Sequence, residues 1–143
     1  MPIIQKHVIM CDDVRQENNG KFMLIGMYTP DIAVPQLPFV MPSLAFFSWL
    51  ESDRLGAFSF RMKLEHLESG QALVEGMGMM QFPRPGVGVS VVRFGGISFT
   101  QPGAYVFSMT FEGQSDRMLT QFSVTLQSTL PALGQLPAPP QRH

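Results

Sequence analysis

Charged residues are scarce in this chain, and the shortage narrows the functions open to it. Only 15% of its 143 residues are charged, against roughly 25% in an average soluble domain, and the formal net charge is -1. Lysine and arginine occur singly rather than in a basic stripe, so we expect no nucleic-acid partner. Apolar residues make up 45% of the chain, which predicts a largely neutral or apolar surface. We therefore expect a homo-oligomer or a contact with another protein.

Cysteine is also nearly absent. Cys11 is the only one, which excludes an intramolecular disulfide and any Cys-x-x-Cys metal or redox motif. A reducing, cytoplasmic location is the simplest interpretation of this cysteine usage. The N-terminus has no basic region followed by a long apolar stretch, so we expect no signal peptide. No apolar run approaches the roughly 20 residues that a membrane helix requires, so we expect no membrane span.

The chain lacks the 3.6-residue apolar period of a helix and shows the two-residue period of strands instead. Between residues 58 and 65, for example, apolar and polar residues alternate strictly, which predicts a strand with one wet face. Seven to nine strands at this spacing predict an all-β fold, an antiparallel β-sandwich of Greek-key or immunoglobulin-like type. A closed β-barrel is the alternative. We expect one domain over residues 1–128 and a Pro-rich, mobile tail over residues 129–143.

The strongest local pattern is a hairpin near the N-terminus. Residues 6–17 predict a strand, and Asn19-Gly20 favours a two-residue type I′ turn because both residues accept positive φ angles. This turn predicts the facing pairs Val14–Ile25, Asp12–Met27 and Cys11–Tyr28. It also places Asp12 on an otherwise apolar face, where a buried carboxylate needs an arginine, a backbone amide or a cation as its partner. A bulge near Asp12 and Asp13 would shift these assignments by one residue.

Three further stretches carry structural information. Prolines at 30, 35, 38 and 42 predict an edge or a crossover, because proline donates no ladder hydrogen bond. Ser43 to Glu51 is nearly all apolar and looks like a strand covered on both faces. The Gln101-Pro102-Gly103-Ala104-Tyr105 stretch resembles the Pro-Gly-x-Tyr corner of immunoglobulin-like sandwiches. This last resemblance bears on architecture only.

The obvious carboxylate group consists of Asp12, Asp13 and Glu17. Paired carboxylates can bind a hard cation or act as acid and base. Neighbouring residues of a strand point to opposite faces, however, so the two aspartates diverge unless a bulge intervenes. The structural interpretation has Arg15 or Lys21 neutralising these carboxylates, and we favour it.

Other reactive residues form no recognisable site. Cys11 and His7 are about 13 Å apart along an extended strand, so they make no dyad, and Cys11 is expected to be a small buried hydrophobe. The histidines lack zinc spacing, and we expect no metal and no cofactor. Arg84 lies between two prolines, which favours either a stiff contact loop or a plain solvated one. Our candidate contact or structural polar residues are Asp12, Asp13, Arg15, Glu17, Tyr28 and Arg84.

The hairpin sequence also carries a resemblance to known proteins. The run Cys-Asp-Asp-Val-Arg-Gln-Glu, then Asn-Gly-Lys and Leu-Ile-Gly-Met-Tyr, resembles a family of small uncharacterised bacterial proteins. Leu37-Pro38-Phe39 and Leu44-Ala45-Phe46-Phe47 extend the resemblance over most of residues 6–127. It implies a bacterial cytosolic β domain. The family has no known function, so no active-site residue follows from it.

These observations favour a protein of unknown function that acts as a non-enzymatic protein-binding or assembly module. An apolar or edge-strand surface would make the contact. One alternative is a metal-dependent or hydrolytic enzyme that uses Asp12, Asp13 and Glu17, with His66 brought in by the fold. Another is a carbohydrate-binding β-sandwich. That function requires exposed aromatic rings, and Trp49 lies in a run too apolar to look exposed.

Overall fold

Two β-sheets packed face to face make up the part of the chain that the structure describes, residues 3–29 and 31–127 of a computed structural model. The strands are β1 (Ile3–Gln16), β2 (Phe22–Met27), β3 (Asp31–Val34), β4 (Phe39–Ser52), β5 (Gly56–His66), β6 (Ala72–Phe82), β7 (Gly86–Phe99), β8 (Gly103–Phe111) and β9 (Met118–Leu126). The predicted tail, residues 129–143, lies outside the described residues. No helix in the described part is long and apolar enough to cross a membrane.

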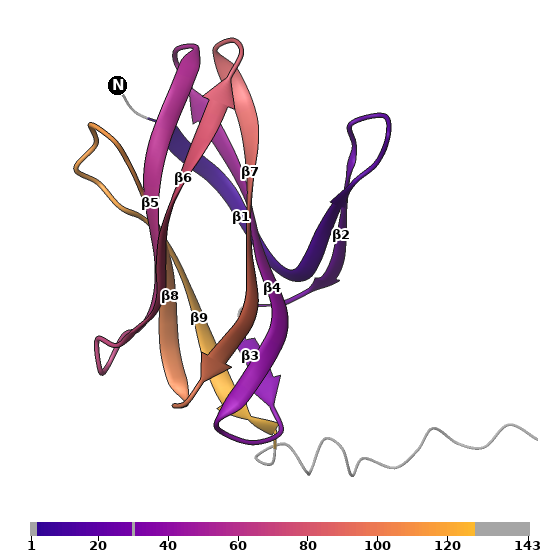
Figure 1. Ribbon diagram of the computed structural model, residues 1–143, viewed down its shortest axis with the longest axis vertical. Helices are drawn as coiled ribbons and strands as arrows, with labels where there is room; N and C mark the ends of the chain where they lie inside the picture. The colour runs from indigo at the N-terminus through magenta and orange to yellow at the C-terminus, as the bar shows by residue number, and fades with distance from the viewer. Residues whose placement is uncertain (1–2, 30, 128–143) are drawn as a thin grey trace, which may run out of the picture.

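The two sheets have the strand orders β2-β1-β4-β7 and β3-β9-β8-β5-β6 (Figure 1). Neighbouring strands run antiparallel except β3 and β9, which pair in parallel. The predicted all-β sandwich is confirmed, and the described strands form two separate sheets rather than a closed barrel. The proline-rich segment is a crossover, as predicted, because short β3 leaves the first sheet for the edge of the second.

Aromatic side chains fill the space between the sheets. Phe46 of β4 stacks on Phe107 of β8, with ring centroids 4.1 Å apart, so the two layers meet at these rings. Phe94 of β7 meets both rings edge-on at about 6 Å. Along β5 the predicted alternation is confirmed, since Phe60 and Leu64 are buried while Arg61 is exposed. The outer face of the second sheet is therefore exposed to solvent.

A tyrosine corner fixes the turn between β7 and β8. The hydroxyl of Tyr105 donates a hydrogen bond of 2.6 Å to the carbonyl oxygen of Gln101, the bond that defines a tyrosine corner in immunoglobulin-like sandwiches. His66, at the end of β5, is only 1% exposed and packs edge-on against the ring of Tyr105. Its Nδ1 lies 2.8 Å from the Ser69 hydroxyl and its Nε2 lies 3.0 Å from the Pro102 carbonyl oxygen. Both ring nitrogens of His66 are thus occupied by structural contacts.

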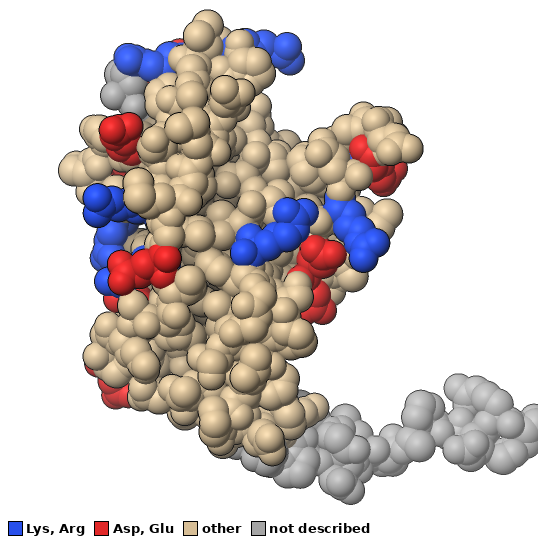
Figure 2. Space-filling view, in the orientation of Figure 1, with Lys and Arg blue, Asp and Glu red and all other residues tan. Residues whose placement is uncertain are grey.

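The surface reflects the low charge content of the sequence. Figure 2 shows charged side chains scattered singly or in small groups over a face that is mostly neutral or apolar. Most ion pairs of the described residues are exposed, such as Lys6–Glu51 at 3.4 Å, and the two that Glu65 forms are partly buried. Exposed pairs contribute about 0 to 1 kcal/mol each, so the aromatic core and the strand ladders carry the stability.

The tyrosine corner generates a stability prediction. Tyr105→Phe removes the hydroxyl and leaves the Gln101 carbonyl without its donor, so we expect a loss of about 1 kcal/mol in the free energy of unfolding. Urea denaturation followed by circular dichroism measures it. Gln101→Ala is the control, because the acceptor is a main-chain oxygen, and it should change stability by less than about 0.5 kcal/mol. Equal losses in the two variants would contradict the role given to the hydroxyl.

Candidate functional site

Strand β1 changes its pairing partner in the middle. Ile3 to Cys11 pair with β4, whereas Cys11 to Gln16 pair with β2. Beyond Cys11 the strand therefore leaves the sandwich, and Figure 1 shows its end and β2 curving away from the two layers. We call this hairpin, residues 11–28, the arm.

Side chains from the first sheet take over the hydrogen bonds that β4 no longer makes with β1. The Ser43 hydroxyl donates to the carbonyl oxygen of Asp12 at 2.6 Å, and the guanidinium of Arg93 donates to that of Val14. Arg93 also forms an ion pair of 3.5 Å with Asp13. These contacts join the departing strand to β4 and β7. They hold the arm at a fixed angle to the sandwich.

A second, smaller core lies beneath the arm. Its buried members are Cys11, Val14, Ala45 and Phe47, with Phe22, Leu24, Val89 and Val91 packed against them. Phe22 of the arm meets Phe47 of β4 edge-on, with ring centroids 5.3 Å apart. This cover explains why residues 44–48 of β4 are buried on both faces, as the apolar run predicts. The inner side of the arm is thus packed against the first sheet.

The structure corrects the predicted register of the hairpin. Val14 pairs with Leu24 and Cys11 with Met27, one residue away from the predicted pairs. The loop has three residues, Asn18 to Gly20, closed by hydrogen bonds from Glu17 N–H to the Lys21 carbonyl and from Gly20 N–H to the Glu17 carbonyl. Only Gly20 has a positive φ angle in this loop, so the predicted type I′ turn is wrong.

Asp12 has a partner that the sequence analysis did not propose. The hydroxyl of Tyr28 donates a hydrogen bond to its carboxylate, and the carboxylate lies directly over Gly26. A side chain at Gly26 would begin 2.2 Å from the carboxylate oxygen, so only glycine fits there. Burial, together with the Asp12 charge, raises the pKa of the Tyr28 hydroxyl well above its usual value. Tyr28 therefore stays a neutral donor at physiological pH.

Asp13 faces cations rather than Asp12. It lies 3.4 Å from Arg15 and 3.5 Å from Arg93, and its carboxylate accepts a hydrogen bond from the N–H of Val14. The N–H of Val14 and the two arginines lower the pKa of Asp13. Arg15 thus pairs with Asp13, whereas Arg93 is a contact that sequence spacing gives no means to find. The two aspartates have separate partners.

The remaining candidate residues lie apart from one another. Glu17 is exposed at the arm's loop, and Arg84 is exposed in the loop between β6 and β7. Cys11 is fully buried in the smaller core, where burial raises the pKa of its thiol. His66 belongs to the second sheet and is held by Ser69 and Pro102. In residues 3–29 and 31–127 no three His, Cys, Asp or Glu side chains gather as metal ligands do.

Trp49 corrects a second expectation. It is 44% exposed on the outer face of β4, beside His7, with ring centroids 6.1 Å apart. The arm covers Ala45 and Phe47 but does not reach Trp49. The apolar run that contains Trp49 is buried by two different parts of the protein. The main core covers one face of β4, and the arm covers part of the other face.

The outer side of the arm is the most distinctive surface. Met23, Ile25 and Met27 alternate along β2 and are 48%, 39% and 66% exposed. Strand β2 is an edge strand of the first sheet, so its outer edge pairs with no described strand. An uncharged apolar strand at an open edge is a surface suited to pairing with another chain.

Comparison with known proteins finds a family and solved structures of similar fold. The model of a family described as "Family of unknown function (DUF6941)" matches residues 6–125. No protein with a curated description matches. A solved structure of the β-glucosidase EmGH1 from Erythrobacter marinus is similar, with 11% sequence identity and a TM-score of 0.52. The similarity covers 87% of this chain and 15% of that chain, so it shows the fold alone.

The contact of Asp12 with Gly26 can be tested by substitution. Gly26 has a φ angle of +68°, so Gly26→Ala adds about 1 to 2 kcal/mol of backbone strain to the clash with Asp12. We expect denaturation to show a destabilisation of at least that size. The double variant Asp12→Ala/Gly26→Ala relieves the clash and should lose less relative to Asp12→Ala alone. Gly95→Ala, whose added carbon would meet nothing closer than 3.8 Å, is the control and should be neutral. A neutral Gly26→Ala would contradict the geometry.

Proposed function

The chain belongs to the family of unknown function DUF6941, and we propose that it works as a homodimeric assembly module whose two copies join through β2. The observation that carries the proposal is the row of Met23, Ile25 and Met27 on an open strand edge. Sandwiches usually protect such edges with lysine, proline or a bulge. Strand β2, Phe22 to Met27, contains neither lysine nor proline, and its one backbone irregularity is the positive φ angle of Gly26 near its end.

The apolar row favours one register among the two-fold symmetric pairings of β2. Two antiparallel copies of one edge strand are related by a two-fold axis perpendicular to the sheet, which keeps each residue on the same face. With Ile25 opposite Ile25 of the second copy, Met23 lies opposite Met27 at both ends. Six apolar side chains then lie along the joint, with the positive φ angle of Gly26 interrupting the pleat before each Met27. Cross-strand pairs of this kind are the unit of sheet stabilisation.

Charge complementarity also favours a second copy. Lys21, at the start of β2, is exposed and forms no ion pair with any residue that the structure describes. At the other end of β2, the Asp12 carboxylate has the neutral Tyr28 hydroxyl as its partner. Antiparallel pairing brings Lys21 of each copy beside the Asp12 end of the other.

The arm is ordered before it binds. Its inner residues Phe22 and Leu24 pack on the smaller core, and Arg93 ties its base to β7. A strand that is already extended and held loses little conformational entropy on pairing. This pre-organisation supports assembly through β2 rather than through a loop.

The proposal places this dimer in the cytoplasm. The single cysteine is buried under the arm, so the fold uses no disulfide that an oxidising compartment would form.

Light scattering after size-exclusion chromatography tests the dimer. We expect the full chain to elute with about twice its mass of 15.9 kDa at micromolar concentrations. Ile25→Lys puts two like charges opposite each other at the axis and should weaken the dimer at least tenfold. Leu55→Lys makes the same change at a residue that is 65% exposed in the β4–β5 turn, and should leave the dimer intact.

Cross-linking tests the register. Ile25→Cys should form a covalent dimer on mild oxidation, because the two residues face each other at the axis, whereas Leu55→Cys should not. Cys11 is fully buried and does not compete. A chain that stays monomeric at hundreds of micromolar, or equal effects of the substitutions at 25 and 55, would refute the proposal.

A further inference from the structure

The outer face of the second sheet carries a groove. A hollow of about 420 Å³ lies over β5, β6 and β8. A second hollow of about 420 Å³ shares Arg61, Met77 and Thr110 with it, and a third of about 390 Å³ shares Lys63 and Arg117. The three hollows are therefore parts of one groove across the sheet, on the sheet that does not contain β2.

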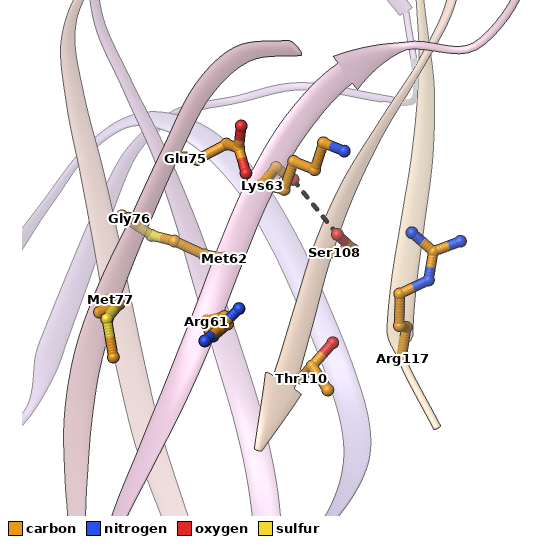
Figure 3. Close-up of a pocket in the computed structure, with 9 residues that line it drawn as sticks. All are labelled: Arg61, Met62, Lys63, Glu75, Gly76, Met77, Ser108, Thr110 and Arg117. Atoms are coloured by element: carbon orange, nitrogen blue, oxygen red, sulfur yellow. Dashed lines mark hydrogen bonds between the residues drawn. The ribbon is translucent and has the colours of Figure 1, made fainter. Parts of the chain in front are cut away.

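Cationic side chains flank a floor of hydroxyls in the middle of this groove. Arg61 and Lys63 point outward from β5, and they pair with Thr110 and Ser108 of β8 in the ladder. Figure 3 shows these two hydroxyl residues between the cations of β5 and Arg117. Serine and threonine are shorter than the residues around them, so the hollow forms above them. The Ser108 hydroxyl donates to the carbonyl oxygen of Lys63 at 3.5 Å, so Thr110 is the residue that can offer a hydroxyl donor to an oxyanion beside Arg61.

The charges of the groove are only partly neutralised. Glu65, whose side chain is 15% exposed, lies 3.8 Å from Lys63 and 3.7 Å from Arg117 and so holds both cations in place. Arg61 forms no ion pair or side-chain hydrogen bond with any residue in the described part of the chain. The Thr110 hydroxyl is likewise without a partner there. A guanidinium and a hydroxyl are thus available side by side.

The charges along the groove balance. Three cations, Arg61, Lys63 and Arg117, stand against three carboxylates, Glu65, Glu75 and Glu112. Of the three cations, Arg61 alone forms no ion pair with a described residue, so a ligand with a single negative charge fits better than a dianion such as phosphate does. The fork of the Arg61 guanidinium matches the geometry of a carboxylate.

An apolar surface adjoins the cation. Met77 of β6 pairs with Arg61 in the ladder, is 72% exposed and lines both of the larger hollows. Its flexible thioether can adapt to an aliphatic chain. We propose that this groove binds a small organic carboxylate, with the carboxylate at Arg61 and Thr110 and its short apolar chain on Met77. This site is independent of the β2 edge.

Titration of the full chain with sodium hexanoate tests the site, followed by amide shifts in ¹H–¹⁵N NMR at pH 7 and constant low ionic strength. We expect saturable shifts at Arg61, Met77 and Thr110. Hexanoate should bind at least fivefold more tightly than acetate, because each buried methylene contributes about 0.8 kcal/mol. It should also bind more tightly than inorganic phosphate, since the groove offers one cation without an ion pair, Arg61, and no net positive charge.

Two arginine variants distinguish binding of hexanoate at the groove from a general effect of the protein's net charge on hexanoate binding. Arg61→Gln should weaken hexanoate binding at least fivefold. Arg84→Gln changes the net charge equally at another exposed arginine, far along the β6–β7 hairpin, and should leave binding unchanged. The proposal is overturned if the groove amides do not shift, if both variants lose affinity equally, or if acetate or phosphate binds as tightly as hexanoate. The chain's oligomeric state is a separate readout, so this test can fail while the β2 dimer stands.

Discussion

The change of partner along β1 is the constraint on which the N-terminal half of the structure depends. A strand that leaves its sheet exposes a row of backbone groups, and burying such groups without partners is costly. Here the Ser43 hydroxyl and the Arg93 guanidinium take the place of the β4 backbone. Because those carbonyls are satisfied, the arm can fold over β4 and form the smaller core. The same geometry turns β2 into an open, apolar edge.

Much of the architecture was predictable because its signals are local. The strict alternation around Phe60 and Arg61 specifies a half-buried strand wherever that strand is placed. The Pro-Gly-x-Tyr corner is contained within a few residues, so its resemblance to immunoglobulin-like sandwiches indicated the architecture, and the hydrogen bond from Tyr105 to Gln101 is the structure's addition to it. The scarcity of charge likewise indicated a neutral, apolar surface. These features depend on neighbours in the sequence.

The register and the sites were not predictable in the same way. Asn-Gly is compatible with a two-residue and a three-residue loop, and the choice of the longer one shifted every pair of the hairpin. The pairing of Asp12 with Tyr28 follows from that register. Arg93 is 79 residues from Val14, and the groove combines Arg61 with Arg117 across three strands. Such contacts are set by tertiary packing, for which the local pattern carries no signal.

The arm also constrains the order in which the chain can mature during synthesis. Strands β1 and β2 leave the ribosome first and can form their hairpin at once, because the pairing is local. The inner face of that hairpin has no cover until β4 and finally β7, residues 86–99, have been made. Until then both sides of β2 are apolar and uncovered. The interval between the first hairpin and the seventh strand is therefore the period in which a nascent chain is most open to premature association.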